Sequence, residues 1–198
     1  MVREYDGLGK SISTVAQSVI QAILDDLGGK GVGQSAEPKK QANKREEAAT
    51  ILSVARKGGM VPITSPLVDL FTEDQNGTEY CIAMTTAKPN AGEFKAHKRT
   101  LLEWIAIRGA TKPTVRIQTM VAIPYNPYEG SPYNRWTMQR WFDADNELLV
   151  GRHFWDFLGG DGTYEELLEI FERVGRELNE DIQPAIERGE RGRRRRGA

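Results

Sequence analysis

Two short apolar runs on either side of an Asn-Gly pair constrain the fold of this chain more than any other feature. The runs cover residues 67–71 and 80–86, and the segment 74–78 between them contains Asn76-Gly77. Asn-Gly favours positive φ angles at both central positions of a tight hairpin turn. We therefore expect two adjacent antiparallel strands, with one carboxylate, Asp69, inside the first strand.

Helical segments surround this hairpin. The expected helices share an apolar residue every three or four positions, and they cover residues 11–27, 43–57, 93–108, 146–158 and 164–187. Residues 115–123 instead alternate in the manner of a strand. The order helix, helix, hairpin, helix, strand, helix, helix predicts an α/β fold with a small mixed sheet flanked by helices.

Composition excludes several classes of protein. The chain has 198 residues, of which 39% are hydrophobic, and it contains one cysteine and two histidines. A single cysteine rules out an intramolecular disulfide and a cysteine-based zinc site, and two histidines rule out a histidine-rich metal site. No apolar stretch reaches the 18 residues that a membrane span needs, and the first residues have no apolar signal region. We expect a cytoplasmic protein that has no contact with a membrane.

Charge is distributed unevenly along the chain. The formal net charge is only -1, but six arginines and two glutamates gather in residues 187–198. Such a run predicts a disordered basic tail over 188–198 that binds polyanions weakly. A solubilising terminus with no other role is an equal alternative.

Asp69 is the first candidate for a functional residue. A carboxylate inside an apolar strand is costly unless it is paired, bound to a metal or turned to water at a sheet edge. Phosphodiester cleavage with Mg²⁺ needs carboxylates that hold the metal and a lysine near the attacking water. Lys88 follows the return strand of the hairpin and is a candidate for this lysine.

Five segments of the chain together resemble a known family. They are Val68-Asp-Leu-Phe71, Met84-Thr-Thr-Ala-Lys-Pro-Asn-Ala-Gly-Glu-Phe94, Lys98-Arg-Thr-Leu-Leu-Glu-Trp104, Ile123-Pro-Tyr-Asn-Pro-Tyr128 and Phe154-Trp-Asp-Phe-Leu-Gly-Gly-Asp-Gly-Thr-Tyr164. In this order and spacing, across about residues 66–178, they resemble the TdeIII-type restriction endonucleases. The resemblance implies the PD-(D/E)XK nuclease fold, Mg²⁺ with no organic cofactor, and duplex DNA carrying a short palindrome as substrate.

The chain differs from the pattern of this family at two positions. That pattern places Glu-x-Lys in the return strand, followed by Thr-x-Lys-Pro-Asn. Counting back from Lys88 and Asn90 puts the glutamate position at Ala83 and the lysine position at Thr85. Asp69 would then hold Mg²⁺, and Lys88 would orient the attacking water or a phosphate. We expect cleavage to be impaired, because neither an alanine nor a threonine supplies the missing charge.

Other residues are weaker candidates. Glu93 and Glu47 (or its neighbour Glu46) are candidates for a further metal ligand. The charge pattern favours a helix-start role for Glu93 and a solvated helix face for Glu46 and Glu47. The candidates for DNA contacts are Asn90, Lys95, Lys98, Arg135 and Arg140. An exact two-residue hairpin loop would pair Asp69 with Met84, and one bulged residue would place Asp69 opposite residue 83 or 85.

These observations lead to a division of the chain and to three functional hypotheses. We expect an N-terminal helix and loop arm over 1–42, a nuclease-like domain over 43–187, and the tail over 188–198. The first hypothesis is a type II restriction endonuclease that acts as a homodimer, with the apolar stripe of residues 12–27 available for dimerisation. The alternatives are a DNA-binding homologue that has lost catalysis and an assembly protein built on the nuclease scaffold.

Overall fold

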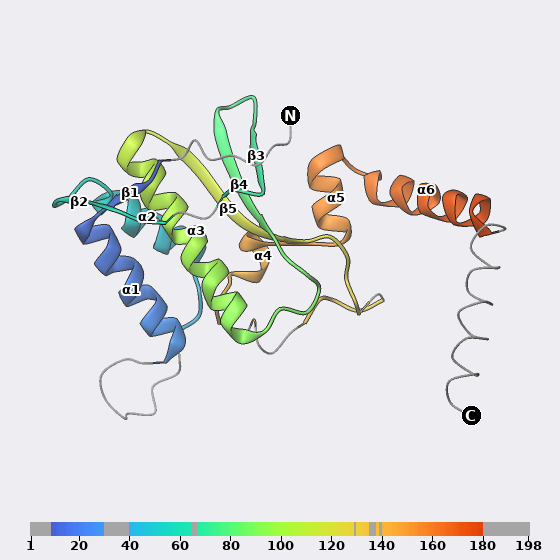
Figure 1. Cartoon of the computed structure of the whole chain (residues 1–198), viewed down its shortest axis with the longest axis horizontal. Coiled ribbons are helices and arrows are strands. Elements are labelled where there is room, and N and C mark those ends of the chain that lie inside the picture. Colours follow the sequence, from blue (N-terminus) through green and yellow to red (C-terminus); the bar gives the residue numbers. More distant parts are fainter. Residues whose placement is uncertain are drawn as a thin grey trace, which may run out of the picture. The chain divides into compact units, whose positions relative to one another are not determined.

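The computed structural model describes residues 9–29, 40–64, 67–128, 130–134, 138 and 140–179. The chain forms two compact units, Met1–Phe154 and Trp155–Ala198, and Figure 1 shows their elements. This division differs from the predicted boundaries at residues 42 and 187. No helix among the described residues is both long enough and apolar enough to cross a membrane.

A four-stranded mixed sheet forms the centre of the first unit. Its strands are β3 (Leu70–Glu73), β4 (Thr78–Met84), β5 (Arg116–Ile123) and β6 (Leu148–Val150), in that spatial order. The β3–β4 pair is antiparallel, whereas β5 runs parallel to both β4 and β6. The predicted hairpin and the predicted mixed sheet are therefore confirmed.

The hairpin turn differs from the predicted two-residue turn. Leu70 pairs with Ile82 and Glu73 pairs with Glu79, so five residues, 74–78, separate the last pair of the hairpin. Gly77 has a φ of 73°, but Asn76 does not adopt a positive φ. The Asp74 carboxylate accepts hydrogen bonds from the backbone nitrogens of Asn76 and Thr78, both at 2.8 Å. Because this side chain satisfies the loop amides, one left-handed residue is enough to close the turn.

The N-terminal helix is shorter than predicted. Residues Ser11–Ser13 form strand β1, which pairs with β2 (Met60–Pro62) in a separate two-stranded sheet. Helix α1 (Thr14–Gly28) follows directly. Ser13 caps its start, because the Ser13 Oγ accepts a hydrogen bond from the Ala16 nitrogen at 3.0 Å. The residue that caps the end of the helix is Gly29, whose left-handed φ of 72° suits a glycine.

Helix α1 belongs to the core of the first unit and is not a separate arm. Its buried residues, Ala16, Ile20, Leu24 and Leu27, all lie in the main hydrophobic cluster. The apolar stripe of residues 12–27 is therefore already covered within the chain, and the prediction that it is available for dimerisation was wrong.

Helix α3 (Ala91–Thr111) is the central helix of this unit. It packs against β4 and β5 on one side and against α1 and α2 (Lys44–Val54) on the other, as Figure 1 shows. The apolar residues Phe94, Leu101, Leu102 and Ile105, which follow the helical period expected over 93–108, are all buried. Because α3 is covered on two sides, Trp104 and Ala106 are buried as well.

The helix that the sequence predicts over residues 146–158 is not a single helix in the structure. The expected helix over 146–158 is instead α4 (Ala144–Glu147), strand β6, and α5 (Arg152–Gly159). The run Leu148-Leu149-Val150 is recruited as a strand because it pairs with residues 121–123 at the end of β5. Helix α6 (Thr163–Glu177) follows, and the predicted end at 187 and the basic tail lie outside the described residues.

We predict that Gly109→Ala destabilises the chain although alanine is the better helix former. A Cβ at Gly109 would lie 2.7 Å from Leu52 Cδ2 and 2.9 Å from Ala55 Cβ, so α2 would have to move. Overpacking of this kind costs about 1–3 kcal/mol, which exceeds a helix-propensity gain of about 1 kcal/mol. Urea unfolding followed by circular dichroism measures the difference.

Gly175→Ala in α6 is the matched control, because no atom lies within 4 Å of its Cβ position. This variant should keep or raise the unfolding midpoint. A higher midpoint for Gly109→Ala than for the unaltered chain would contradict the described packing of α2 on α3.

Candidate functional site

Asp69 lies at the entrance to β3 rather than inside the strand. Asp69 is exposed, and its Oδ2 accepts a hydrogen bond from the Met84 nitrogen at 2.7 Å. Continuing the hairpin register by one residue from Leu70 and Ile82 sets Asp69 opposite Ala83. This register matches the bulged alternative, because an odd number of residues, 74–78, separates Glu73 from its partner Glu79.

Asp69 and Ala83 face one cavity of about 350 Å³. The cavity is formed by the hairpin and by one face of α3, and its lining residues are Leu67, Asp69, Ala83, Ala96, His97, Thr100 and Trp104. The structure thus brings the predicted aspartate and the predicted glutamate position together. Thr85 lies two residues further along, where its nitrogen donates to the Ala122 oxygen at 3.0 Å and extends the contact of β4 with β5.

His97 also lines the cavity, and its sequence context does not predict a functional role. Burial lowers the pKa of its imidazole, while the carboxylates of Asp69 and Glu93 act in the opposite direction. The ring is therefore neutral at neutral pH. A helix-period count places His97 three residues beyond the buried Phe94, but nothing in that count indicates that the hairpin aspartate lies opposite.

Lys88 and Asn90 occupy the connection between β4 and α3. Lys88 is exposed, and it is not among the described residues that line the cavity. The Asn90 Oδ1 accepts from the nitrogens of Gly92 and Glu93, at 2.8 and 3.0 Å, and caps α3. The Glu93 Oε2 in turn accepts from the Asn90 nitrogen at 2.6 Å. Both side chains thus form a capping box, which is the helix-start role considered for Glu93.

The donor groups at the cavity do not fit a catalytic Mg²⁺ site. Mg²⁺ requires near-octahedral oxygen ligands, usually from one or two carboxylates together with water and phosphate. Asp69 is the only acidic residue among those that line the cavity, and one of its oxygens already accepts from Met84. The described part of the chain contains no group of three histidine, cysteine, aspartate or glutamate side chains arranged to hold a metal.

Glu79, the other carboxylate of β4, is committed to a different contact. It is buried, and its oxygens accept from Arg108 at 2.5 and 2.8 Å and from Lys112 at 3.0 Å. Burial alone would raise the pKa of Glu79, but the two cations outweigh burial and lower it. Glu79 therefore holds the start of β4 against the end of α3.

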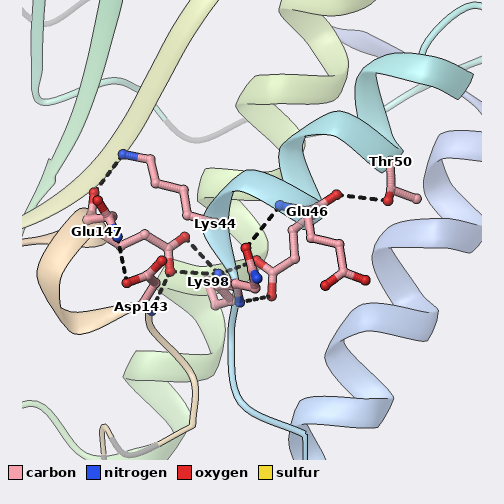
Figure 2. A network of polar contacts seen from close by, with 9 residues as sticks. Lys44, Glu46, Thr50, Lys98, Asp143 and Glu147 are labelled. Carbon is pink, nitrogen blue, oxygen red and sulfur yellow. Dashed lines mark hydrogen bonds and ion pairs between the residues drawn. The ribbon is translucent and has the colours of Figure 1, made fainter.

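Lys98 is buried in an ion-pair cluster, which corrects its assignment as a DNA contact. Its Nζ lies 2.7 and 2.8 Å from the two carboxylate oxygens of Glu147 (Figure 2), and 2.6 Å from Glu47 Oε2. Its side chain is fully buried, so no phosphate reaches the ammonium group in this conformation. Glu47 is also buried, and the prediction of a solvated helix face was wrong for this residue.

Backbone nitrogens donate further hydrogen bonds to the two carboxylates of the cluster. Glu47 Oε1 accepts from the Asn43 nitrogen at 3.2 Å, and Glu147 Oε2 accepts from the Asp143 nitrogen at 2.8 Å. Burial raises the pKa of Glu147, while Lys98 opposes the rise. Burial also lowers the pKa of the neighbouring Lys44 to about 8. The arrangement joins α2, α3 and α4 and leaves Glu47 engaged away from the Asp69 cavity.

Two of the remaining candidates for DNA contacts, Lys95 and Arg140, lie near Trp141. Lys95 Nζ is 6.0 Å from the centroid of the Trp141 ring, and Lys95 is half-buried. Arg140 has a φ of 80°, and its backbone oxygen accepts from the Ala42 nitrogen at 3.0 Å. Arg135 lies outside the described residues. The structure thus places two predicted cations, Lys95 and Arg140, next to one aromatic residue.

We predict that Lys98→Met lowers the free energy of unfolding by about 3 kcal/mol, because removing one partner leaves two carboxylates buried together. Thermal unfolding at neutral pH measures the loss. Lys95→Met is the matched control on the same helix, since Lys95 keeps contact with solvent and should change stability by less than about 0.5 kcal/mol. Equal effects of the two substitutions would contradict a structural role for the cluster.

Comparison with known proteins identifies relatives of one kind. A family model described as "Type II restriction endonuclease, HinfI" matches residues 6–175. The type II restriction enzyme HgiCII of Herpetosiphon aurantiacus is 31% identical over 117 residues, which are 58% of this chain and 42% of that protein. HgiEI of the same organism is 28% identical over 123 residues, 58% of this chain and 44% of the relative.

A relative from a distant source extends this set. The type II restriction enzyme MjaII of Methanocaldococcus jannaschii is 28% identical over 120 residues, which are 54% of this chain and 32% of that protein. The chain spans less than half the length of the curated relatives that it matches. The mixed sheet flanked by helices agrees with a restriction endonuclease-like fold. Because the family model covers most of the sequence, the chain belongs to the HinfI family of type II restriction endonucleases.

Proposed function

We propose that this chain binds duplex DNA and cleaves it weakly or not at all. One observation carries the proposal: Asp69 shares its cavity with Ala83, at the position where the resemblance expects a glutamate. Members of this class of enzyme generally depend on a divalent metal, and a site with one carboxylate, already hydrogen-bonded through Oδ2, holds Mg²⁺ weakly. The DNA-binding homologue without catalysis is thus the hypothesis that the geometry favours.

Loss of the lysine position acts in the same direction. A lysine beside the attacking water contributes a positive charge where negative charge develops in the transition state. The threonine at position 85 has no charge, and Lys88 lies outside the described cavity lining. A conformational change would be needed before Lys88 served this role.

DNA binding is the part of the family's function that the chain keeps in this proposal. Exposed Lys88 and half-buried Lys95 and Arg140 are the described cations that we assign to phosphate contacts. Phosphate contacts of this kind are electrostatic and independent of base sequence. The TdeIII-type resemblance further suggests a short palindrome, a two-fold homodimer and a cytoplasmic location, all of which we include in the proposal.

The test of catalysis is to restore the two missing groups. Supercoiled plasmid is incubated with Mg²⁺ and the unaltered chain, with Ala83→Glu plus Thr85→Lys, or with the uncharged control Ala83→Gln plus Thr85→Met. We expect cleavage only from the charged pair, and we expect Asp69→Asn to abolish that activity. The amide keeps an oxygen that accepts from the Met84 nitrogen, so this last change removes mainly the charge.

Strong cleavage by the unaltered chain that Asp69→Ala abolishes would show that the catalytic roles have moved to other residues. That result would contradict the proposal and favour an active restriction endonuclease. Activity that is insensitive to Asp69 would show that the site assignment itself is wrong.

The test of binding is the salt dependence of DNA affinity, measured by fluorescence anisotropy. Each phosphate contact contributes a slope of about 0.9 in log affinity against log salt, so Lys88→Ala should lower the slope by about one. Lys57→Ala, at an exposed lysine in the turn after α2, is the control and should leave the slope unchanged. An absence of binding even at low salt would favour the assembly-protein hypothesis instead.

A further inference from the structure

Large apolar side chains are exposed at one edge of the four-stranded sheet. The described residues of the first unit include five such side chains, at Val15, Met60, Leu67, Met84 and Tyr125. Because β3 is antiparallel to β4 and β5 is parallel to β4, the start of β3 and the ends of β4 and β5 lie at the same edge. Leu67, Met84 and Tyr125 occupy these three places, and Tyr125 is the most exposed of the five, at 58%. Exposed apolar residues concentrated in this way mark an interaction surface.

The loop that carries Tyr125 is held beside Lys88. The Tyr133 hydroxyl, further along this loop, donates a hydrogen bond to the Ala87 oxygen at 3.0 Å. The rings of Tyr128 and Tyr133 pack together, with their centroids 5.9 Å apart. Ala87 is buried and directly precedes the exposed Lys88. The loop after β5 and the connection after β4 therefore form one continuous surface.

Cations accompany the apolar side chains at this edge. Lys88 follows β4 and Arg152 follows β6, and both are exposed. The Gly151 nitrogen donates to the Ile123 oxygen at 2.9 Å, which holds the residues after β6 beside the end of β5. The edge also carries one carboxylate, Asp69, which lines the cavity. An exposed aromatic ring flanked by cations is the composition of surfaces that stack on nucleic-acid bases while they hold the phosphates.

We propose that this edge binds DNA at an unpaired base, which stacks on the Tyr125 ring. The inference rests on the proposed DNA binding and adds to it the form of DNA that the chain prefers. In a regular duplex both faces of every base are covered by its neighbours, so a protein ring reaches a base face only where that base leaves the stack. Lys88 and Arg152 supply charge for the phosphates on either side. Because every base has an aromatic face, the preference is for the unpaired state and not for a sequence.

Fluorescence anisotropy of the full chain tests the proposal with two labelled duplexes of the same sequence, one fully paired and one with a single bulged thymidine. The unaltered chain should bind the bulged duplex at least about fivefold more tightly, which is the lower end of the effect of one stacked base. Tyr125→Leu should remove this preference and change the affinity for the paired duplex less than about twofold, because leucine offers no aromatic face.

Two further variants are controls. Tyr125→Phe keeps the ring and should keep the preference, whereas Phe171→Leu removes an exposed ring of the second unit and should also keep it. Equal affinities of the unaltered chain for the two duplexes would overturn the proposal, as would a preference that Tyr125→Leu retains. A preference lost in both Tyr125→Leu and Tyr125→Phe would indicate a contact of the hydroxyl group and would also contradict stacking.

Salt dependence separates this inference from the proposed function. Lys88→Ala should lower the salt slope for both duplexes, whereas Tyr125→Leu removes no charge and should leave both slopes unchanged. Salt-dependent binding of both duplexes without a preference for the bulge would overturn this inference alone. An absence of binding to either duplex at low salt would contradict the proposed function as well. A change of sedimentation in Tyr125→Leu with unaltered DNA affinities would assign the surface to a second copy of the chain instead.

Discussion

The fold of the first unit depends on one buried ammonium group. Lys98 lies in the middle of α3 with its side chain fully buried, and a buried charge persists only when it is paired. Glu47 from α2 and Glu147 from α4 supply that pairing, so three helices that are distant in sequence are fixed around one point. His97 is the adjacent residue on α3, and the ion pairs that hold Lys98 therefore also fix the helix face that lines the Asp69 cavity.

The residues that line the Asp69 cavity and the residues that pack the fold are constrained independently of each other. In the function that we propose, the hairpin, its register and the contact of Asp69 with β4 correspond to the layout of a nuclease site. Asp69 and Ala83 still face each other across that layout, but an alanine brings no ligand and no charge. Packing residues such as Trp104 keep the cavity in place without reference to the chemistry that it supports. In our proposal, this fold retains DNA binding although catalysis has been lost.

The sequence predicted the elements that have strong local signals and missed those that depend on distant partners. The Asn76-Gly77 pair located the hairpin, although the Asp74 carboxylate changed the type of turn. Strand β6 was missed because residues 148–150 become a strand only by pairing with β5. The pairing of Lys98 with Glu147 joins residues 49 positions apart, and a helical count alone treats both as solvated charges. The cavity position of His97 was missed for the same reason.

Calorimetric titration of the unaltered chain with Mn²⁺, a divalent ion that also favours oxygen ligands, measures whether the Asp69 cavity holds a metal, because it reports on the donor set rather than on turnover. The account predicts no saturable binding below about 1 mM, since a single carboxylate with one committed oxygen provides too few ligands. Stoichiometric binding at micromolar concentration that disappears in Asp69→Asn would contradict the account. That result would mean that other side chains complete the metal site around Asp69.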